Sequence, residues 1–273
     1  MSCPFSGKAQ ARHSHCDDRR YGDYLTLDNI LSCQKPLSDV PEEMLFIIQH
    51  QTTELWMKLM LHELCLANNL VRNERVCELR RTFHRIHRII EHMIHAWTVL
   101  DTLSPVDFLK MRPFLGSASG DQSLQFREIE FLLGNKDVNA LVEHSACASL
   151  HQKLADPSIY DTIVAMLGKR GFNISTARIN SVSNEPTQHD DSVESAWLEI
   201  YRNTDKFPDL YDLAEDLIEF EDRFKHWRFH HICTVERVIG YRQGTAGTSG
   251  VGYLREKSKV ILFPELWSIR TKL

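Results

Sequence analysis

The feature that most constrains the fold is a long, nearly uncharged helical stretch with one histidine in its middle. Residues 43–56 read Glu-Met-Leu-Phe-Ile-Ile-Gln-His-Gln-Thr-Thr-Glu-Leu-Trp. In and just after this stretch, apolar residues recur at helical spacing, at Leu45, Ile48, Leu55 and Leu59. This spacing predicts one helix face that packs in the core of the protein.

A second line of side chains runs along a neighbouring face of the same helix. Phe46, His50 and Glu54 are each four residues apart, and residues at this spacing stack on one face. An aromatic ring, an imidazole and a carboxylate are therefore expected to face one place. By itself, the pattern favours a structural histidine that is satisfied within the core.

Composition indicates a soluble, mainly helical protein. The 273 residues are 42% hydrophobic and 25% charged, and glycine and proline are few, at 12 and 9. This is ordinary for a globular chain of one large domain or two small ones. A formal net charge of -5 gives no electrostatic reason to expect binding to nucleic acid or to an anionic membrane.

The sequence carries no sign of membrane insertion, export or a cysteine-based site. No window has the roughly eighteen consecutive apolar residues of a membrane span, and residues 1–8 lack the apolar core of a signal peptide. The seven cysteines are odd in number and include no Cys-x-x-Cys pair. This argues against a zinc site, a disulfide framework and covalent c-type haem, and predicts a cytoplasmic protein.

The order of patterns along the chain predicts an all-α bundle. Residues 1–20 are polar and without period, so we expect a flexible arm, followed by one helical domain over residues 21–273. The segment 173–192, rich in Ser, Asn, Thr and Asp, is expected to be a loop or excursion within that domain. Helices are predicted over about 43–70, 74–100, 105–115, 122–134, 135–154, 156–167, 195–201 and 210–240.

The helix predicted over 74–100 raises the question of a metal site. His84, His87, Glu91 and His95 share one of its faces. The arginines interleaved along the helix favour a solvated charged face over a row of metal ligands. The Glu-x-x-His pairs of di-iron bundles and the His-Glu-x-x-His signature of zinc hydrolases are both absent from the sequence.

An arginine lies where an anion could bind. Phe108 and Arg112 are four residues apart on the helix that Ser104-Pro105 begins, and the loop 116–121, Gly-Ser-Ala-Ser-Gly-Asp, follows directly. A guanidinium beside backbone donors and the hydroxyl of Ser119 is suited to a carboxylate. The alternative is a surface charge without a ligand.

The last long helix contains adjacent histidines, of which only one can face a given pocket. His231 shares its face with Phe224, Arg228 and Val235, whereas His230 lies about 100° away. His231 is thus the better candidate for a buried ligand. The loop 244–250, Gly-Thr-Ala-Gly-Thr-Ser-Gly, follows the helix and is suited to closing over a bound molecule.

Together, these stretches resemble the tryptophan 2,3-dioxygenase family of haem enzymes, and the resemblance runs from residue 21 to about residue 271. It rests on several motifs in one order: Tyr-x-x-Tyr-Leu at 21–25, Phe-Ile-Ile-Gln-His-Gln-Thr-x-Glu-Leu-Trp at 46–56, Phe-x-x-x-Arg at 108–112, Gln-Ser-Leu-Gln-Phe-Arg at 122–127, Trp-Arg-Phe-x-His at 227–231, Val-Glu-Arg-Val-Ile-Gly at 235–240, and the Gly-Thr loop at 244–250.

The resemblance implies a cofactor and roles for individual residues. His231 matches the proximal ligand of the iron of haem b, and His50 matches the distal histidine that accepts a hydrogen bond from the indole N–H. Phe46 matches the wall beside the indole. Arg112 matches the group that grips the substrate carboxylate, together with the Ser119 loop, and Thr245 the contact to the ammonium.

The resemblance also implies an oligomer, and it is incomplete at one position of the proposed substrate site. Tyr21, Tyr24 and Leu25 match residues that a neighbouring subunit contributes to the pocket, which implies a homotetramer with exchanged N-terminal arms. Phe108 stands where some members have a tyrosine that also reaches the carboxylate, and a phenyl ring cannot do this.

The implied reaction is the conversion of L-tryptophan and dioxygen to N-formylkynurenine, a step of tryptophan catabolism in the kynurenine pathway. Two positions depart from the family pattern: Ala246 replaces a glycine of the closing loop, and Asp121 replaces an aromatic residue. These departures leave open a specialised monooxygenase that converts a tryptophan derivative, such as β-methyltryptophan, to a 2-oxindole. A non-catalytic haem sensor is the second alternative.

Overall fold

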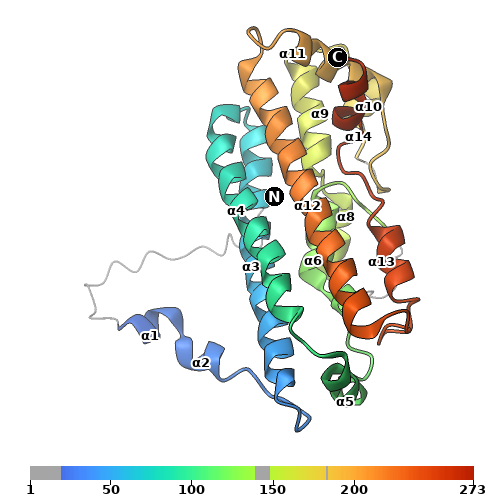
Figure 1. Ribbon diagram of the computed structural model, residues 1–273. Helices are drawn as coiled ribbons and strands as arrows, with labels where there is room; N and C mark the ends of the chain where they lie inside the picture. The colour runs from blue at the N-terminus through green and yellow to red at the C-terminus, as the bar shows by residue number, and fades with distance from the viewer. Residues whose placement is uncertain (1–19, 139–147, 183) are drawn as a thin grey trace.

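The computed structural model describes residues 20–138, 148–182 and 184–273, and this part of the chain is helical and without strands (Figure 1). Three long helices form its centre: α3 (Glu42–Arg72), α4 (Val76–Leu100) and α12 (Pro208–Ile239). Helix α4 packs against both of the others. The predicted all-α class is confirmed.

The turns at the helix ends bring distant residues to one end of the bundle. At Glu74, with a φ of +56°, the chain reverses direction, and the amides of Glu74 and Arg75 donate to the carbonyls of Val71 and Leu70, each at 2.9 Å. Helix α12 instead runs parallel to α4. The beginning of α3 and the ends of α4 and α12 therefore meet at the lower end of Figure 1.

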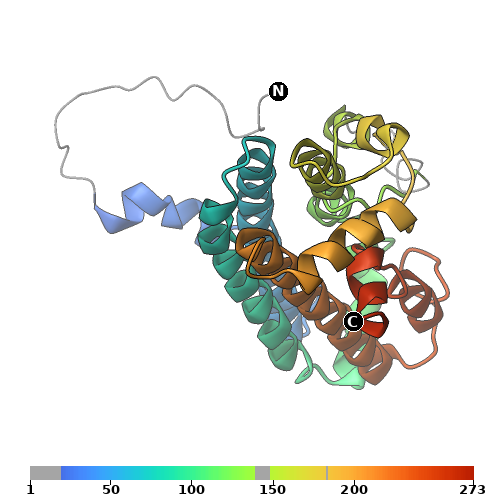
Figure 2. The same cartoon turned by 90° about the horizontal axis from the view of Figure 1, so that it is seen from above.

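Shorter helices close the two ends of the bundle. Helices α5 and α13 lie at the lower end, and α9, α10, α11 and α14 at the upper end (Figure 1). Figure 2 shows the molecule from above this upper end. The bounds of the shorter elements are α1 (Tyr21–Leu25), α2 (Leu27–Leu31), α5 (Pro105–Leu115), η1 (Gly120–Gln122), α6 (Leu124–Leu132), α8 (Ala148–Ala155), α9 (Ile159–Lys169), α10 (Thr176–Asn180), α11 (Asp191–Arg202), α13 (Val251–Lys257), α14 (Pro264–Ser268) and η2 (Ile269–Thr271).

Polar side chains at the N-termini fix where several of these helices begin. The Ser104 hydroxyl accepts from Val106 N at the start of α5, and Ser123 caps α6 in the same way. Ser158 and Asp161 form a reciprocal capping box on α9. Such caps satisfy amides that have no partner within the helix.

The core face predicted for α3 is wrong at three of its four positions. Ile48, Leu55 and Leu59 are 44%, 52% and 36% exposed, and only Leu45 packs against the core. The buried residues are Met57, Met60, Leu61 and Leu64. The helix is apolar on more than one side, so its period alone could not indicate which side α4 and α6 would cover.

Two other sequence expectations differ from the structure. The helix predicted over 135–154 does not include residues 135–138, which are not helical; residues 139–147 lie outside the described part, and α8 covers the remainder. The excursion 173–192 contains the short α10 and the start of α11. The arm predicted at 1–20 lies outside the described residues except for Arg20.

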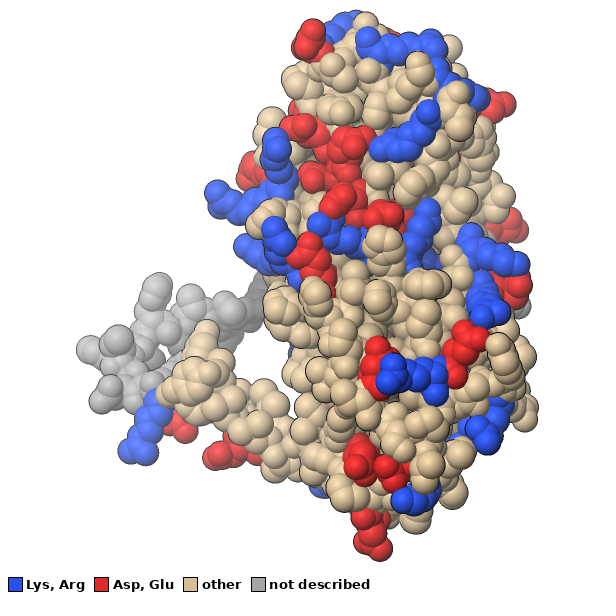
Figure 3. Space-filling view, in the orientation of Figure 1, with Lys and Arg blue, Asp and Glu red and all other residues tan. Residues whose placement is uncertain are grey.

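Helices α1 and α2 stand away from the body of the molecule (Figures 1 and 3). Tyr21 and Tyr24 are 76% and 72% exposed, and Ile30 and Leu31 are also exposed. Large apolar side chains in this position are typical of a segment that packs on another molecule. No helix in the described part of the chain is long and apolar enough to cross a membrane.

Candidate functional site

A large cavity lies at the end of the bundle where α3 begins and α4 and α12 end. Its empty volume is about 1570 Å³, counting the part that is open to solvent. The structure brings seven of the sequence-predicted site residues together on its wall: Phe46, His50, Phe108, Arg112, Ser119, Thr245 and His231. They come from three helices and two loops that are far apart in the sequence.

His50 is held in one tautomer by its own helix. Its Nδ1 lies 2.7 Å from the carbonyl oxygen of Phe46, and because a carbonyl only accepts, Nδ1 carries the proton of the neutral ring. Burial lowers the pKa of His50 below its ordinary value. The imidazole is therefore neutral at physiological pH, and its Nε2 is a hydrogen-bond acceptor.

The predicted line of side chains on α3 does face the cavity. Phe46, His50 and Glu54 all line it, and the Phe46 ring lies 4.2 Å from the His50 ring and 6.1 Å from that of Phe108. Glu54 accepts a hydrogen bond from Gln125 Nε2 at 2.7 Å. The phenyl rings of Phe46 and Phe108 thus form an apolar wall beside the His50 imidazole.

His231 enters the cavity from α12, as its helix face predicted. Its ring stacks on Trp97 of α4, with centroids 4.8 Å apart and planes 8° apart, while His230 is exposed. Burial is the main cause that lowers the pKa of His231, to about 4. A neutral imidazole in an apolar wall is the form that ligates iron.

The proposed anion-binding arginine faces the cavity between two loops. Arg112 donates through Nη2 to the carbonyl of Gln243, while its Nη1 is buried and has no partner. Thr245 donates to the carbonyl of Ala118 at 2.5 Å. Residues 243–245 are thereby joined to α5 and to the loop that follows it, and one guanidinium nitrogen is left for a ligand.

Buried donors without partners are concentrated in this cavity. Of the described residues on its wall, Trp97 Nε1, Arg112 Nη1, Arg127 Nε, Trp227 Nε1, and Arg228 Nε and Nη2 have no hydrogen-bond partner. All of these atoms are nitrogen donors. Leaving such a group unsatisfied costs about 1–3 kcal/mol, so the cavity is chemically suited to an occupant with several acceptor oxygens and a large apolar body.

A buried ionic network on the same wall was not predicted from the sequence. Arg127, only 3% exposed, donates to Asp121 on one side and to Glu130 on the other, the latter at 2.6 Å. The Tyr253 hydroxyl donates to Asp121 Oδ2 at 2.9 Å. Trp97 was also missed, although its position on the buried face of an amphipathic helix was a usable signal.

Three predicted site residues lie outside this cavity. Tyr21, Tyr24 and Leu25 are absent from its wall and project from the body on α1. A site within one subunit therefore does not include them.

The structure does not bring together the histidines of the candidate metal stripe on α4. His84 and His95 are exposed, while His87 is buried and its Nε2 donates to the Asp216 carbonyl at 3.0 Å. Glu91 is bound by Arg88 and Arg223, at 2.6 Å and 2.8 Å. The face is an ion-paired surface, as the interleaved arginines indicated.

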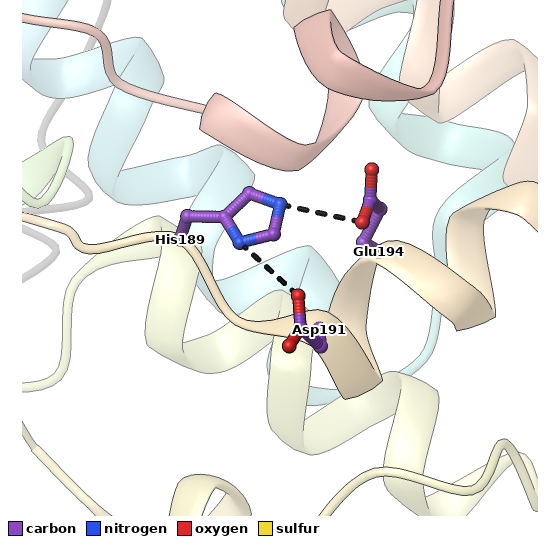
Figure 4. Close-up of side chains that lie close together, drawn as sticks. All are labelled: His189, Asp191 and Glu194. Atoms are coloured by element: carbon purple, nitrogen blue, oxygen red, sulfur yellow. Dashed lines mark ion pairs between the residues drawn. The ribbon is translucent and has the colours of Figure 1, made fainter. Parts of the chain in front are cut away.

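A second cluster with potential metal ligands lies at the other end of the bundle. His189 faces Asp191 and Glu194, at 3.7 Å and 3.4 Å between ring nitrogen and carboxylate oxygen (Figure 4). Glu194 is already satisfied there, by Lys272 at 2.8 Å and by Ser268 at 2.7 Å. The cluster serves to fix the C-terminal segment and is unrelated to the cavity.

Comparison with known proteins agrees with this geometry. The family model described as tryptophan 2,3-dioxygenase matches residues 6–149 and 178–273. A tryptophan 2,3-dioxygenase of Pseudomonas fluorescens is 49% identical, with 99% of each chain covered. Those of Paraburkholderia phytofirmans and Cupriavidus necator are 49% and 47% identical, with 98% and 99% of this chain and 89% and 98% of theirs covered. The chain belongs to the tryptophan 2,3-dioxygenase family.

The two departures from the family pattern fall in different surroundings. Ala246 is exposed, has no positive φ and does not line the cavity, so its methyl group lies away from the cavity wall. Asp121 does line the cavity, with a side chain only 14% exposed. In this dioxygenase family member, Asp121 is therefore the departure that can affect the site.

Proposed function

We propose that this chain is a haem-dependent tryptophan 2,3-dioxygenase that converts L-tryptophan and dioxygen to N-formylkynurenine. The observation that supports this most is the composition of the cavity wall: two neutral imidazoles from separate helices, apolar rings, and buried nitrogen donors without partners. Such a wall can ligate the iron of a porphyrin, pack against its apolar ring and donate hydrogen bonds to its carboxylates. It can also donate to the carboxylate of an amino-acid substrate.

The residues of the cavity fit haem b. His231 would supply the axial ligand, and its stacking on Trp97 restricts the rotation of the imidazole. The unpartnered donors of Trp97, Trp227 and Arg228 are suited to the carboxylates of the porphyrin. When bound, haem would supply a ferrous iron that activates dioxygen toward the electron-rich indole double bond.

The other side chains orient the substrate. His50 Nε2 would accept the indole N–H, because Nδ1 is committed to the Phe46 carbonyl, and Phe46 would bound the ring. Arg112 would bind the carboxylate through its free nitrogen, close to the hydroxyl of Ser119, and Thr245 would contact the ammonium. Such positioning converts an encounter between two molecules into a reaction within one complex.

We propose a homotetramer in which each pocket is completed by a neighbour. Support comes from the exposed apolar side chains of α1, α2 and α3, including Tyr21, Tyr24 and Ile48. An exposed apolar surface of this kind is typical of an interface. Tyr21, Tyr24 and Leu25 would then enter the cavity of another subunit, and the domain of residues 21–273 would act only in the assembly. Light scattering on the purified protein measures the mass of the assembly, and a mass of four chains is expected.

We place the enzyme in the cytoplasm, in the tryptophan catabolism of the kynurenine pathway. Support comes from three exposed cysteines, Cys33, Cys77 and Cys233, that form no disulfide in the structure. Thiols of this kind are typical of a reducing compartment.

The reaction is tested by weighing the product. The haem-loaded, reduced protein is mixed with L-tryptophan and isotopically labelled dioxygen, and the product is analysed by mass spectrometry. Gain of both labelled atoms with opening of the indole ring is expected. Gain of one atom, to give a 2-oxindole, would identify a monooxygenase, and an unchanged substrate would identify a sensor; either result would overturn the proposal. A parallel sample with β-methyltryptophan compares the two substrates directly.

A further inference from the structure

We propose that Asp121 is a positioning residue that links the loop after α5 to α13 and so holds the segment 243–253 over the cavity before substrate binds. The segment contains Thr245, and it also supplies the carbonyl that Arg112 binds. Its position therefore determines how the two proposed contacts to the amino-acid end of the substrate are presented.

The link is the Asp121 carboxylate, each oxygen of which accepts a hydrogen bond from a different side chain. Arg127 Nη2 donates to Oδ1 and, at 3.2 Å, to the backbone carbonyl of Asp121, while the Tyr253 hydroxyl donates to Oδ2 at 2.9 Å. Burial and the neighbouring Asp121 raise the pKa of Tyr253 to about 12. The phenol therefore keeps its proton, and the hydrogen bond persists, at any physiological pH.

Two further hydrogen bonds join the same parts of the chain. Arg112 of α5 donates to Gln243, and Thr245 donates to Ala118. Both donors belong to the proposed substrate-binding set, so L-tryptophan that binds to them can perturb both contacts. The bond between Asp121 and Tyr253 involves neither donor, so it can stay intact while the others change.

The chemistry of position 121 is what makes the link possible. An apolar side chain there could not accept from a hydroxyl or a guanidinium. The Tyr253 hydroxyl and one side of the buried Arg127 would then have to find other partners. Arg127 is 3% exposed, and its Nε already lacks a partner. Its buried positive charge is therefore stabilised by the carboxylates of Asp121 and Glu130 together.

Hydrogen–deuterium exchange of the haem-loaded protein without substrate tests the link. Tyr253→Phe, which removes only the hydroxyl, and Asp121→Ala are both expected to raise exchange in residues 243–257 roughly tenfold, as for the loss of one hydrogen bond to a charged group. Asp121→Asn keeps an acceptor oxygen, so exchange in the same residues is expected to rise less in this variant. Tyr241→Phe is the matched control, because Tyr241 lies just before the segment and is 83% exposed.

The double variant separates this link from general loosening. Exchange in Asp121→Ala with Tyr253→Phe should equal that of Asp121→Ala alone, because both changes remove the same bond. Unchanged exchange in Tyr253→Phe, or an equal rise in Tyr241→Phe, would overturn the proposal. Should Asp121→Ala fail to fold, Tyr253→Phe still decides, because it leaves the Arg127 pairs intact.

The effect on substrate rests on the proposed tryptophan site and has a separate readout. In Tyr253→Phe the dissociation constant for L-tryptophan, measured by its perturbation of the haem spectrum, is expected to rise about tenfold, with kcat nearly unchanged. Faster exchange with an unchanged dissociation constant would overturn the positioning role. Failure of the wild-type protein to bind L-tryptophan would contradict the proposed function, while the exchange result would still decide whether the link exists.

Discussion

The two ends of the bundle differ in how far their buried polar groups are hydrogen-bonded. At the cavity end, donors of Trp97, Trp227 and Arg228 lack partners. Toward the other end, Glu221 is fully buried, yet it accepts from Leu262 N at 2.9 Å, Phe263 N at 3.0 Å and Trp267 Nε1 at 2.8 Å.

The difference teaches where a ligand belongs. Unsatisfied buried groups destabilise the folded protein, so a cluster of them on one cavity wall is explained by an occupant that satisfies them. Toward the opposite end, the unpartnered atoms include the acceptors Asn68 Oδ1 and Glu265 Oε2, and burial raises the pKa of the Glu265 carboxyl and favours its neutral form. The cavity end is built for binding, and the opposite end is built for stability.

The largest expected effect follows removal of the imidazole that we propose as the iron ligand. His231→Ala is expected to abolish stable haem binding, because the cavity offers no other imidazole on α12. The Soret absorbance and haem content of the purified protein measure this. His230→Ala is the matched control: it removes the adjacent, exposed histidine and should retain a full haem content. Equal haem content in the two variants would contradict the ligand assignment.

Loss of the guanidinium that we propose binds the substrate carboxylate should have the next largest effect. Arg112→Ala is expected to weaken L-tryptophan binding by about 2–3 kcal/mol, or roughly 30- to 150-fold, as for a hydrogen bond between charged groups. Arg112→Lys should recover little, because an ammonium lacks the planar fork. The exposed Lys110 on the same helix provides the control Lys110→Ala.

Titration with L-tryptophan checks this prediction, and kcat at saturating substrate gives a second readout. A KM that is unchanged in Arg112→Ala, or that rises equally in Lys110→Ala, would show that the carboxylate binds elsewhere.

The pH dependence of activity should be a moderate effect with a definite sign. Burial lowers the pKa of His50, so the ring is neutral above that pKa and Nε2 is free to accept the indole N–H, as proposed. As the pH falls through the lowered pKa, a proton occupies Nε2 and the acceptor is lost. The value of kcat/KM should therefore decline in acid, with a midpoint below the ordinary histidine value of about 6.5.

A series of initial rates against pH measures this midpoint. His50→Gln keeps a polar side chain that does not titrate in this range, so it should lose the acid limb that belongs to the imidazole. A midpoint at or above 6.5, or an acid limb retained unchanged in His50→Gln, would remove His50 from this role.

The smallest effect is expected at the satisfied end. His189→Ala should leave the haem spectrum unchanged and alter the free energy of unfolding by less than about 0.5 kcal/mol, because its carboxylate contacts are partly exposed and Glu194 keeps Lys272 and Ser268. Urea unfolding monitored by circular dichroism checks this. A change in haem content would show that the two ends are coupled and would break the comparison.

Helical period correctly predicted which side chains of two helices face the cavity. It placed Phe46, His50 and Glu54 on one line and selected His231 over His230, because these relations depend only on the geometry of a single helix. The chemical roles of these residues came from the family resemblance and not from the period.

The remainder depends on packing between distant parts of the chain. Period could not choose between the apolar faces of α3, so it placed Ile48 and Leu55 in the core. The bond between Asp121 and Tyr253 joins residues 132 positions apart, and nothing local to either residue predicts it. The stacking of Trp97 on His231 likewise exists only after α4 and α12 have packed side by side.

The most direct test of the central claim is a titration of the haem-free protein with haemin, monitored at the Soret band, followed by reduction and addition of L-tryptophan. The account predicts saturation at one haem per chain and a ferrous spectrum that L-tryptophan perturbs. A protein that develops no Soret band with excess haemin, or whose ferrous spectrum is insensitive to L-tryptophan, would contradict it.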